Sequence, residues 1–305
     1  MILDISIIIP SYNRLWSLPK AISSCHETAL NIEVIVIDDG STDGTWNWLA
    51  KQQNIVALRQ DNMGKDWAVN KGFSIAKGKY IRFLDSDDWL LPGSSLSLFT
   101  LSEKNQLDIA CAGYQLFDEQ EQFIKEISWT ICDDFLAQQL GECESSHYSA
   151  YLFKKEFIQA IPHRQEFGAL DDRQFVIEAA LNQPKTDFIP MPTLAHRVHQ
   201  KQRLQNATGL QISANHLAQL TIYKRSIARL STKGILTQRY KNAVCNTLWH
   251  LSHWIAKTHL ADGREVYDWV YELNPNFKPT ENLGIARLYK HFGFTMSEKL
   301  LKLRR

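Results

Sequence analysis

The 305-residue chain lacks any long apolar run, which limits where it can act. No stretch of about 18 apolar residues occurs, so we expect no transmembrane helix. Residues 1–10 carry no basic segment ahead of their short apolar run, which predicts a first strand and not a signal peptide. We expect a cytoplasmic protein, with peripheral contact to the inner face of a membrane left open.

Paired cysteines and an excess of one charge are also missing. The five cysteines are scattered and never form a Cys-x-x-Cys pair, which is typical of reduced thiols in a cytoplasmic protein. A net charge of +1 argues against nucleic acid as the main partner. The 44% hydrophobic and 22% charged residues are ordinary for a globular protein, and the length suits one large α/β domain with a smaller addition.

The stretch Lys79–Trp89 begins with the pattern of a buried strand, and three aspartates follow that strand directly. Alternation along extended backbone would place Asp85 and Asp87 on the same side, with Asp88 starting a turn. Two close carboxylates repel, so they require a raised pKa or a cation such as Mg²⁺ or Mn²⁺. The stretch therefore indicates a metal-bound diphosphate, while a polar turn capping the helix after Pro92 remains an alternative.

Apolar runs alternate with helical patterns in the first third of the chain. This order predicts a parallel sheet with helices on both faces. Polar clusters follow each strand, at the sheet edge where open α/β sheets bind ligands. The expected strands are Ile5–Ile9, Val34–Ile37 and Ile55–Leu58, and the helices are Ser17–Thr28, Thr45–Lys51 and Asp66–Ala76.

The middle of the chain predicts strands at Asp108–Phe117 and Tyr148–Phe153, with helices from Lys155 and over Val176–Leu181. From about Asn206 the pattern is helical. We therefore expect a catalytic domain at 1–205, with a nucleotide-binding half at about 1–110 and an acceptor half at about 111–205, and a helical appendage at 206–305.

Several polar residues invite two interpretations. Asp39 can accept hydrogen bonds from a base or ribose, although an Asp-Gly turn explains the same sequence. Asn62 and Gly64 can simply start a helix, and Asn70 inside that helix needs exposure or a partner. Arg82 within a buried strand predicts an edge position or an ion pair with an acid.

Four segments in this order resemble the motifs of family 2 glycosyltransferases: Ile7–Asn13, Val36–Thr45, Asn62-x-Gly64 with Asn70-x-Gly72, and Leu84–Asp88. The resemblance implies a GT-A fold, a Rossmann-like, mostly parallel sheet, and inverting sugar transfer from a nucleotide-diphosphate sugar. By that resemblance Tyr12 and Asp39 contact the nucleoside, Asp85 the ribose or diphosphate, and Asp87 the metal. The remaining motif positions assigned to the donor are Pro10, Asn13, Asn62, Gly64, Asn70 and Ser86.

One motif position departs from the family. Val69 stands where many members carry arginine, so any phosphate contact of that arginine must come from elsewhere, and we assign it to Lys65.

The pair Asp171-Asp172 follows a glycine-containing loop and opens a helix. In the family an acidic pair at this place supplies the catalytic base, so the resemblance assigns the base to Asp172 and an acceptor-binding or supporting role to Asp171. The alternative is that both acids only favour the positive end of the helix.

Two histidines and two cations occur together in the segment Leu194–Lys201. Such a loop suits a lid over diphosphate, and histidine can also ligate a metal. We assign Arg197 to the diphosphate and His199 to the metal, beside Asp87 and Asp85, with His196 left as the other possible ligand. For Lys201 and Arg203 a solvated basic loop is an equal alternative.

We therefore expect an inverting, hexosyltransferase-type enzyme that requires Mn²⁺ or Mg²⁺ and moves a sugar from a UDP-sugar to a saccharide or lipid-linked acceptor. Bacterial surface polysaccharide, lipopolysaccharide or glycan synthesis is the expected setting. The alternatives are a sugar nucleotidyltransferase, whose glycine-rich basic loop is absent after the first strand, and a non-catalytic sugar-nucleotide-binding homologue. The last residues, Lys299–Arg305, form a basic amphipathic pattern that can contact an anionic membrane.

Overall fold

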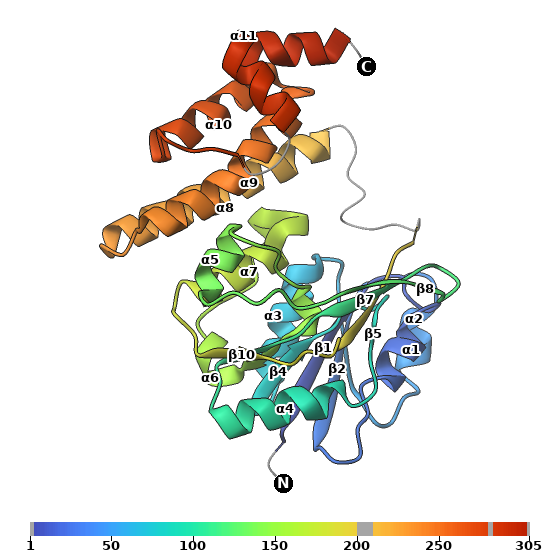
Figure 1. Cartoon of the computed structure of the whole chain (residues 1–305). Helices are drawn as coiled ribbons and strands as arrows, with labels where there is room; N and C mark the ends of the chain where they lie inside the picture. The colour runs from blue at the N-terminus through green and yellow to red at the C-terminus, as the bar shows by residue number, and fades with distance from the viewer. Residues whose placement is uncertain (1–2, 200–209, 280–282, 304–305) are drawn as a thin grey trace. The chain divides into compact units, whose positions relative to one another are not determined.

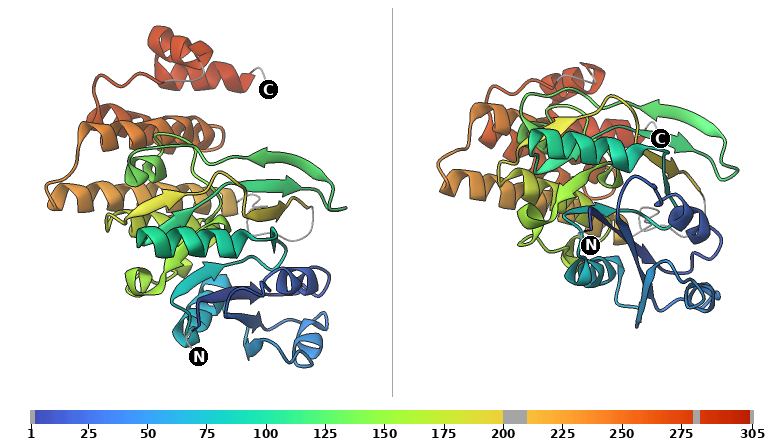
Figure 2. Two further views of the ribbon diagram at one scale, coloured as in Figure 1. Left: turned by 60° about the horizontal axis from the view of Figure 1, so that its bottom comes forward. Right: turned by 90° about the horizontal axis from the view of Figure 1, so that it is seen from below.

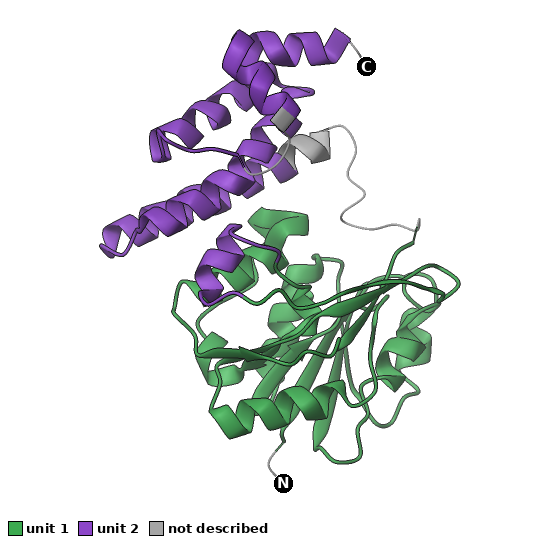
Figure 3. Ribbon diagram, in the orientation of Figure 1, with its two compact units in different colours: residues 1–131, 145–204 green, residues 132–144, 205–305 purple. Residues whose placement is uncertain are grey.

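The computed structural model describes residues 3–199, 210–279 and 283–303, which form two compact units (Figure 3). Unit 1 comprises Met1–Ile131 and Ser145–Leu204, and unit 2 comprises Cys132–Glu144 and Gln205–Arg305. The change of unit after Leu204 lies next to the boundary expected from the sequence. The short segment Cys132–Glu144 is grouped with unit 2, and nothing in the sequence pattern indicated this.

Unit 1 is built on a seven-stranded sheet in which only β9 runs antiparallel to its neighbours (Figure 1). The mostly parallel sheet predicted from the alternating apolar runs is therefore confirmed. In spatial order its strands are β10 (Thr186–Phe188), β6 (Ile109–Cys111), β9 (Leu152–Lys154), β4 (Tyr80–Phe83), β1 (Ile5–Ser11), β2 (Ile32–Asp39) and β3 (Val56–Gln60).

Helices cover both faces of this sheet, as the sequence predicted. Ile5, Ile7 and Ile9 pack with residues of α1 and α4, whereas Ile8 faces Gly72 of α3. The alternation of side chains along β1 thus supplies one apolar face to each helical layer. Figure 2 gives two further views, with α4 in teal beside the sheet. The helices of unit 1 are α1 (Leu18–Ser23), α2 (Thr45–Leu49), α3 (Lys65–Ile75), α4 (Ser94–Asn105), α6 (Lys155–Ile158) and α7 (Asp171–Ala180), with 3₁₀ turns η1 (Tyr148–Ala150) and η2 (Gln165–Leu170).

A second sheet of four strands divides the predicted strand Asp108–Phe117 in two. Its order is β5 (Trp89–Leu90), β11 (Leu194–Arg197), β7 (Tyr114–Phe117) and β8 (Phe123–Ile127). The chain leaves the large sheet after β6 and enters the small one at β7, passing Gly113. A Cβ at Gly113 would lie 2.3 Å from the Ile127 carbonyl oxygen, so only glycine permits this crossing. The prediction of one continuous strand was wrong.

The predicted strand Tyr148–Phe153 is also shorter than expected. Its first residues form η1, because the His147 ring accepts a hydrogen bond from the Ser149 amide and closes a turn. Only Leu152–Lys154 joins the sheet, as the antiparallel strand β9. The helix α1 likewise ends at Ser23, before the predicted end at Thr28.

Arg82 lies in β4, which is central in the large sheet, and its side chain is fully buried. The predicted edge position is wrong. In place of an acid, the guanidinium donates to the hydroxyls of Ser94 and Ser95, at 2.9 Å each, and to the Thr193 carbonyl at 3.0 Å. Burial lowers the pKa of Arg82 to about 10, but this value still lies well above neutral pH, so the side chain stays charged. It joins α4 and the start of β11 to the sheet.

We expect Arg82→Ala to destabilise the fold by about 3 kcal/mol or more. The change opens a cavity and leaves two hydroxyls and one carbonyl without their buried donor. Urea unfolding followed by circular dichroism measures this loss. Lys79→Ala, at an exposed position just before β4, is the control, since it removes a surface ion pair with Glu103 and a contact with the Tyr80 ring. Equal midpoints for the two variants would contradict the role assigned to Arg82.

Unit 2 is helical, as expected for the C-terminal region. The amphipathic helices α9 and α10 pack together, and Gly263 of α10 lets the two backbones approach, since a Cβ there would meet the Ser252 carbonyl at 2.7 Å. Trp249 is buried in this unit, whereas Trp254 is 57% exposed. The helices are α5 (Phe135–Leu140), α8 (Leu210–Thr232), α9 (Gln238–Ala256), α10 (Leu260–Leu273) and α11 (Leu283–Leu303).

Candidate active site

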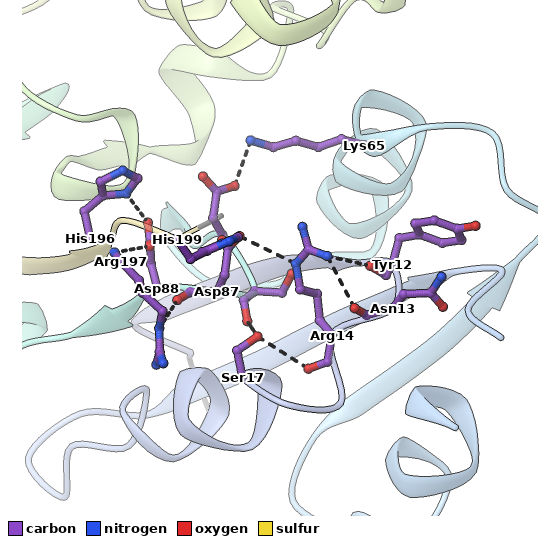
Figure 4. Close-up of polar contacts among 12 residues, drawn as sticks. Tyr12, Asn13, Arg14, Ser17, Lys65, Asp87, Asp88, His196, Arg197 and His199 are labelled. Carbon is purple, nitrogen blue, oxygen red and sulfur yellow. Dashed lines mark hydrogen bonds and ion pairs between the residues drawn. The ribbon is translucent and has the colours of Figure 1, made fainter. Parts of the chain in front are cut away.

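The loop after β1 is fixed to the loop after β2 by the side chain of Asn13. The backbone N–H of Asn13 donates to the Ser41 hydroxyl at 2.8 Å, and the Asn13 side-chain oxygen accepts from the backbone N–H of Thr42 at 2.8 Å. Asn13 has φ 53, a left-handed conformation that asparagine tolerates. Asn13 therefore orders the loop that carries Tyr12, whose half-buried side chain lies beside it (Figure 4).

Pro10 decides where the sheet opens. The Ile8 carbonyl accepts a hydrogen bond from the Leu84 amide at 3.0 Å. The backbone of Pro10, two residues later, faces the same neighbouring strand, but proline has no N–H to donate to it. Pairing between β1 and β4 stops at Ile8 and Phe83. The acidic turn that follows Phe83 leaves the sheet at this point.

Asp39 is buried and holds the loop that leads into α3. Its two oxygens accept from Gln60 at 2.8 Å and from the amides of Met63 and Gly64 at 2.9 Å each. Asn62 packs closely on Gly40, where a Cβ would come within 2.8 Å of the Asn62 nitrogen. An open pocket beside them is lined by Gly40, Arg59, Gln60, Asp61 and Asn62. A nucleoside contact of Asp39 stays a prediction, because both its oxygens are bonded within the protein and Asp39 does not line this pocket.

The acidic turn after β4 is held by backbone and side-chain hydrogen bonds. The Asp88 amide donates to the Asp85 carbonyl at 3.1 Å, and the Ser86 carbonyl accepts from the Ser17 hydroxyl at 2.8 Å. The turn is thus anchored to the start of α1. Asp85 and Asp87 each face a different protein cation, so the repulsion expected between them is relieved inside the protein.

Asp87 lies between His199 and Arg14 (Figure 4). The His199 Nε2 is 2.9 Å from an Asp87 carboxylate oxygen, and the Arg14 Nε is 3.5 Å from the same oxygen. His199 is buried and its other ring nitrogen, Nδ1, has no hydrogen-bond partner. An imidazole nitrogen beside a carboxylate is a donor set that suits Mn²⁺ and similar divalent ions. Asp87 and His199 would therefore supply one oxygen and one nitrogen ligand to such an ion, whereas Asp85 faces Lys65, and the metal site itself stays a prediction.

Asp88 holds β11 against the acidic turn. Its carboxylate accepts from the Arg197 amide at 2.9 Å and lies 2.9 Å from the His196 Nδ1. The Arg197 guanidinium donates to the Asp87 carbonyl at 3.1 Å and to Glu121 at 2.8 Å, and it lies over the Trp89 ring. Arg197 is therefore engaged by the protein, and a diphosphate contact would require it to exchange partners.

Two groups of three His and Asp side chains converge among the residues that the structure describes. They are Asp88 with His147 and His196, and His163 with Asp171 and Asp172. Burial and the neighbouring His196 lower the pKa of His147 to about 3, so it is neutral at physiological pH. Its Nδ1 already accepts from Ser149, which places the ring proton on Nε2. In the group of Asp88, His147 and His196, the His147 Nε2 is therefore a hydrogen-bond donor and is poorly suited to be the third ligand of a metal.

Lys65 joins the donor motif to the candidate base. From the start of α3, its ammonium reaches Asp85 at 2.7 Å and Asp172 at 2.8 Å. Burial raises the pKa of Asp172 above its ordinary value, although the Lys65 charge opposes this. Burial is also the largest single influence on Asp85 and raises its pKa, but the charge and hydrogen bond of Lys65, together with His147, lower it by more, so the net pKa of Asp85 is lowered. The structure thus gives the two carboxylates different proton affinities around one shared cation.

Asp171 is buried and supports the loop before α7. Its oxygens bind the His163 Nδ1 and the Arg164 amide, and the His163 Nε2 is 2.7 Å from the Tyr148 hydroxyl. Asn70 exchanges two hydrogen bonds with the His163 backbone, at 2.8 and 3.0 Å. Asn70 thereby finds the partner that its position in a helix required. Neither acid is the N-cap of α7, which is Leu170, but both lie in its first turn, so the alternative that they favour the positive end of the helix stays open.

Arg14 and His163 are among the residues of this site that were not assigned from the sequence. Arg14 directly follows the motif that ends at Asn13, and its charge next to that motif was a usable signal. His163 lies in a loop eight residues before Asp171, and no pattern there indicated a site residue. The basic loop expected at Lys201 and Arg203 lies outside the described residues.

A family model for glycosyl transferase family 2 matches residues 6–158, half of the chain. The chain belongs to glycosyltransferase family 2. GlyA of Streptococcus pneumoniae is 34% identical over 122 residues, which are 38% of this chain and 18% of that protein. EpsH of Bacillus subtilis, a putative glycosyltransferase, is 26% identical over 209 residues, 64% of this chain and 61% of that protein. The matches to the most similar curated relatives span about a fifth of their length.

Solved structures show the same fold. The crystal structure of S. aureus TarS 1-349 aligns with a TM-score of 0.66 at 12% identity, covering 99% of this chain and 92% of that one. TarS 1-349 in complex with UDP-GlcNAc aligns at a TM-score of 0.60 with 14% identity, over 99% of this chain and 93% of that one. The family 2 fold expected from the sequence motifs is therefore confirmed. No helix among the described residues is long and apolar enough to cross a bilayer.

Proposed function

We propose that this family 2 enzyme transfers a sugar, with inversion, from a nucleotide-diphosphate sugar to the hydroxyl of a saccharide or lipid-linked acceptor. A UDP-sugar is the proposed donor, supported by a structural neighbour whose crystals contained UDP-GlcNAc or UDP. We propose that the transferred sugar is a hexose and that the reaction belongs to the synthesis of a bacterial surface glycan.

The observation that carries the proposal is the position of Lys65 between Asp85 and Asp172. A carboxylate of the motif assigned to donor binding and the carboxylate assigned as base face one ammonium from opposite sides. Donor and acceptor must meet at such a place for direct transfer. One oxygen of Asp172 is buried without a partner, so it is able to accept a proton from an acceptor hydroxyl.

The residues of the chain divide the reaction between them. Asp172 takes the proton of the acceptor hydroxyl as its oxygen bonds to the anomeric carbon. The bond from that carbon to the diphosphate oxygen breaks, and nucleotide diphosphate leaves on the opposite face of the sugar. Lys65 binds the phosphate charge and fills the role left open by Val69. Asp171 positions the α7 start through His163 and Arg164.

A divalent ion would be held by Asp87 and His199. When bound, Mn²⁺ or Mg²⁺ supplies positive charge that stabilises the departing diphosphate. Asp85, which the sequence also assigned to the metal, faces Lys65 at 2.7 Å.

A screen of UDP-, dTDP- and GDP-sugars with Mn²⁺ tests the proposal through release of nucleotide diphosphate. We expect slow hydrolysis of at least one donor, because water can replace the acceptor. Formation of a sugar nucleotide from nucleoside triphosphate and sugar 1-phosphate would instead identify a nucleotidyltransferase. Tight donor binding with no release under any acceptor would identify a non-catalytic binding protein.

Replacing Lys65 tests the shared cation. We expect Lys65→Met to lower kcat/KM for the donor by about 10- to 100-fold, because two carboxylates then lack a charge-assisted partner and the phosphate loses a cation. Lys65→Arg should recover part of this loss. Lys71→Met removes a lysine of the same helix that only donates to the Arg59 carbonyl, and it should retain activity. Near-native kcat/KM in Lys65→Met would show that the lysine is not part of the donor site.

A further inference from the structure

The C-terminal part of α11 exposes a stripe of large apolar side chains. Gly293, with φ 71 and ψ 163, divides α11 into two segments, and the bend is visible in Figure 1. In the second segment Met296 is 54% exposed, Leu300 40% and Leu303 84%. Their spacing of four and three residues places them on one face of the helix. Contiguous exposed apolar side chains of this kind mark an interaction surface.

This stripe is not the face by which the helix packs in unit 2. Phe294, Ser297 and Glu298 are buried on the other side. The Phe294 ring lies 4.6 Å from that of Tyr267, and Glu298 binds the His253 ring at 2.6 Å. The segment is therefore anchored through its inner face, and the stripe is left over for another partner.

The charges beside the stripe have one sign. Glu298 is the only acid in the sequence of α11, and it is buried. The exposed side chains of the helix include four cations: Arg287, Lys290, Lys299 and Lys302. An apolar stripe bordered by lysines, with no exposed acid on the helix, is complementary to an anionic surface that is apolar beneath its charges.

We propose that the Met296–Leu303 stripe of α11 binds the surface of an anionic phospholipid bilayer. The apolar side chains enter the boundary between headgroups and acyl chains, and Lys299 and Lys302 contact lipid phosphates. A second copy of the chain fits the surface less well, because it would bring the same positive charges into contact. The proposal is independent of the transfer reaction, since binding to vesicles needs neither donor nor turnover.

Flotation of the full chain with phosphatidylcholine vesicles, with or without phosphatidylglycerol, tests this surface. We expect binding only to the anionic vesicles, weakening as NaCl shortens the screening length below about 10 Å. Lys299→Gln with Lys302→Gln should lower the partition coefficient about fivefold per lysine, roughly 25-fold for both. Leu300→Gln with Leu303→Gln should lower it at every salt concentration, because it removes the apolar contact.

Two substitutions serve as matched controls. Leu217→Gln removes an exposed leucine of α8, which is 60% exposed, and Lys233→Gln removes an exposed lysine beyond α8. Both should bind vesicles like the original chain. Absence of binding by the original chain, equal binding to neutral vesicles, or equal losses in the controls would overturn the proposal. A dimer in light scattering that the Leu300/Leu303 variant abolishes would assign the stripe to a second copy instead.

Discussion

Asp172→Asn should fold, bind donor with near-native affinity and lose about 10²- to 10⁴-fold in transfer rate. Asparagine keeps the shape of the side chain but cannot accept the acceptor proton, and general-base catalysis is typically worth this factor. The fold should tolerate the change, because Lys65 keeps its second carboxylate partner, Asp85, at 2.7 Å. Single-turnover transfer at saturating donor separates this loss from any change in binding.

Asp171→Asn is the matched variant one residue away. Asp171 is 2% exposed and binds the His163 ring and the Arg164 amide, so its loss should lower the free energy of unfolding by about 1.5–3 kcal/mol. Its transfer rate should fall less than that of Asp172→Asn. A larger transfer loss in Asp171→Asn at unchanged stability would move the base to Asp171. Near-native transfer by both would refute the mechanism.

Chelation of divalent ions should lower the transfer rate by on the order of 10³-fold, since a cation bound at the diphosphate stabilises the transition state by several kcal/mol. Calorimetric titration of UDP should likewise show tighter binding with Mn²⁺ than with chelator. Asp87→Asn should remove most of this difference, because Asp87 is the carboxylate that His199 contacts at 2.9 Å.

UMP is the ligand control for the metal experiment. It carries the same nucleoside without the diphosphate, so Mn²⁺ should change its affinity much less than that of UDP. Equal UDP affinity in Mn²⁺ and in chelator, together with full transfer activity in chelator, would exclude the metal site at Asp87. Lys65 and Arg14 would then be the cations that neutralise the diphosphate.

The local elements near the nucleotide motifs could be predicted because their signals are short-range. Ile5–Ile9 and Val34–Ile37 are continuous apolar runs, which a strand covered on both faces requires. Gly40, with φ 77, and Gly64, with φ 104, mark the turns that follow β2 and β3. Two of the errors lie at Gly113 and His147, where close backbone packing divides one predicted strand and a side-chain hydrogen bond delays the start of another.

The sequence by itself determined the fold class, the order of the first strands and the acids Asp39, Asp85, Asp87 and Asp172 as site candidates, because motif spacing and apolar periodicity are properties of the chain alone. Which acid meets which cation was decided only by the tertiary structure. Lys65 reaches Asp172 across 107 positions, and His199 reaches Asp87 across 112. Pairings over such separations depend on how strands and helices pack, and no local pattern encodes them.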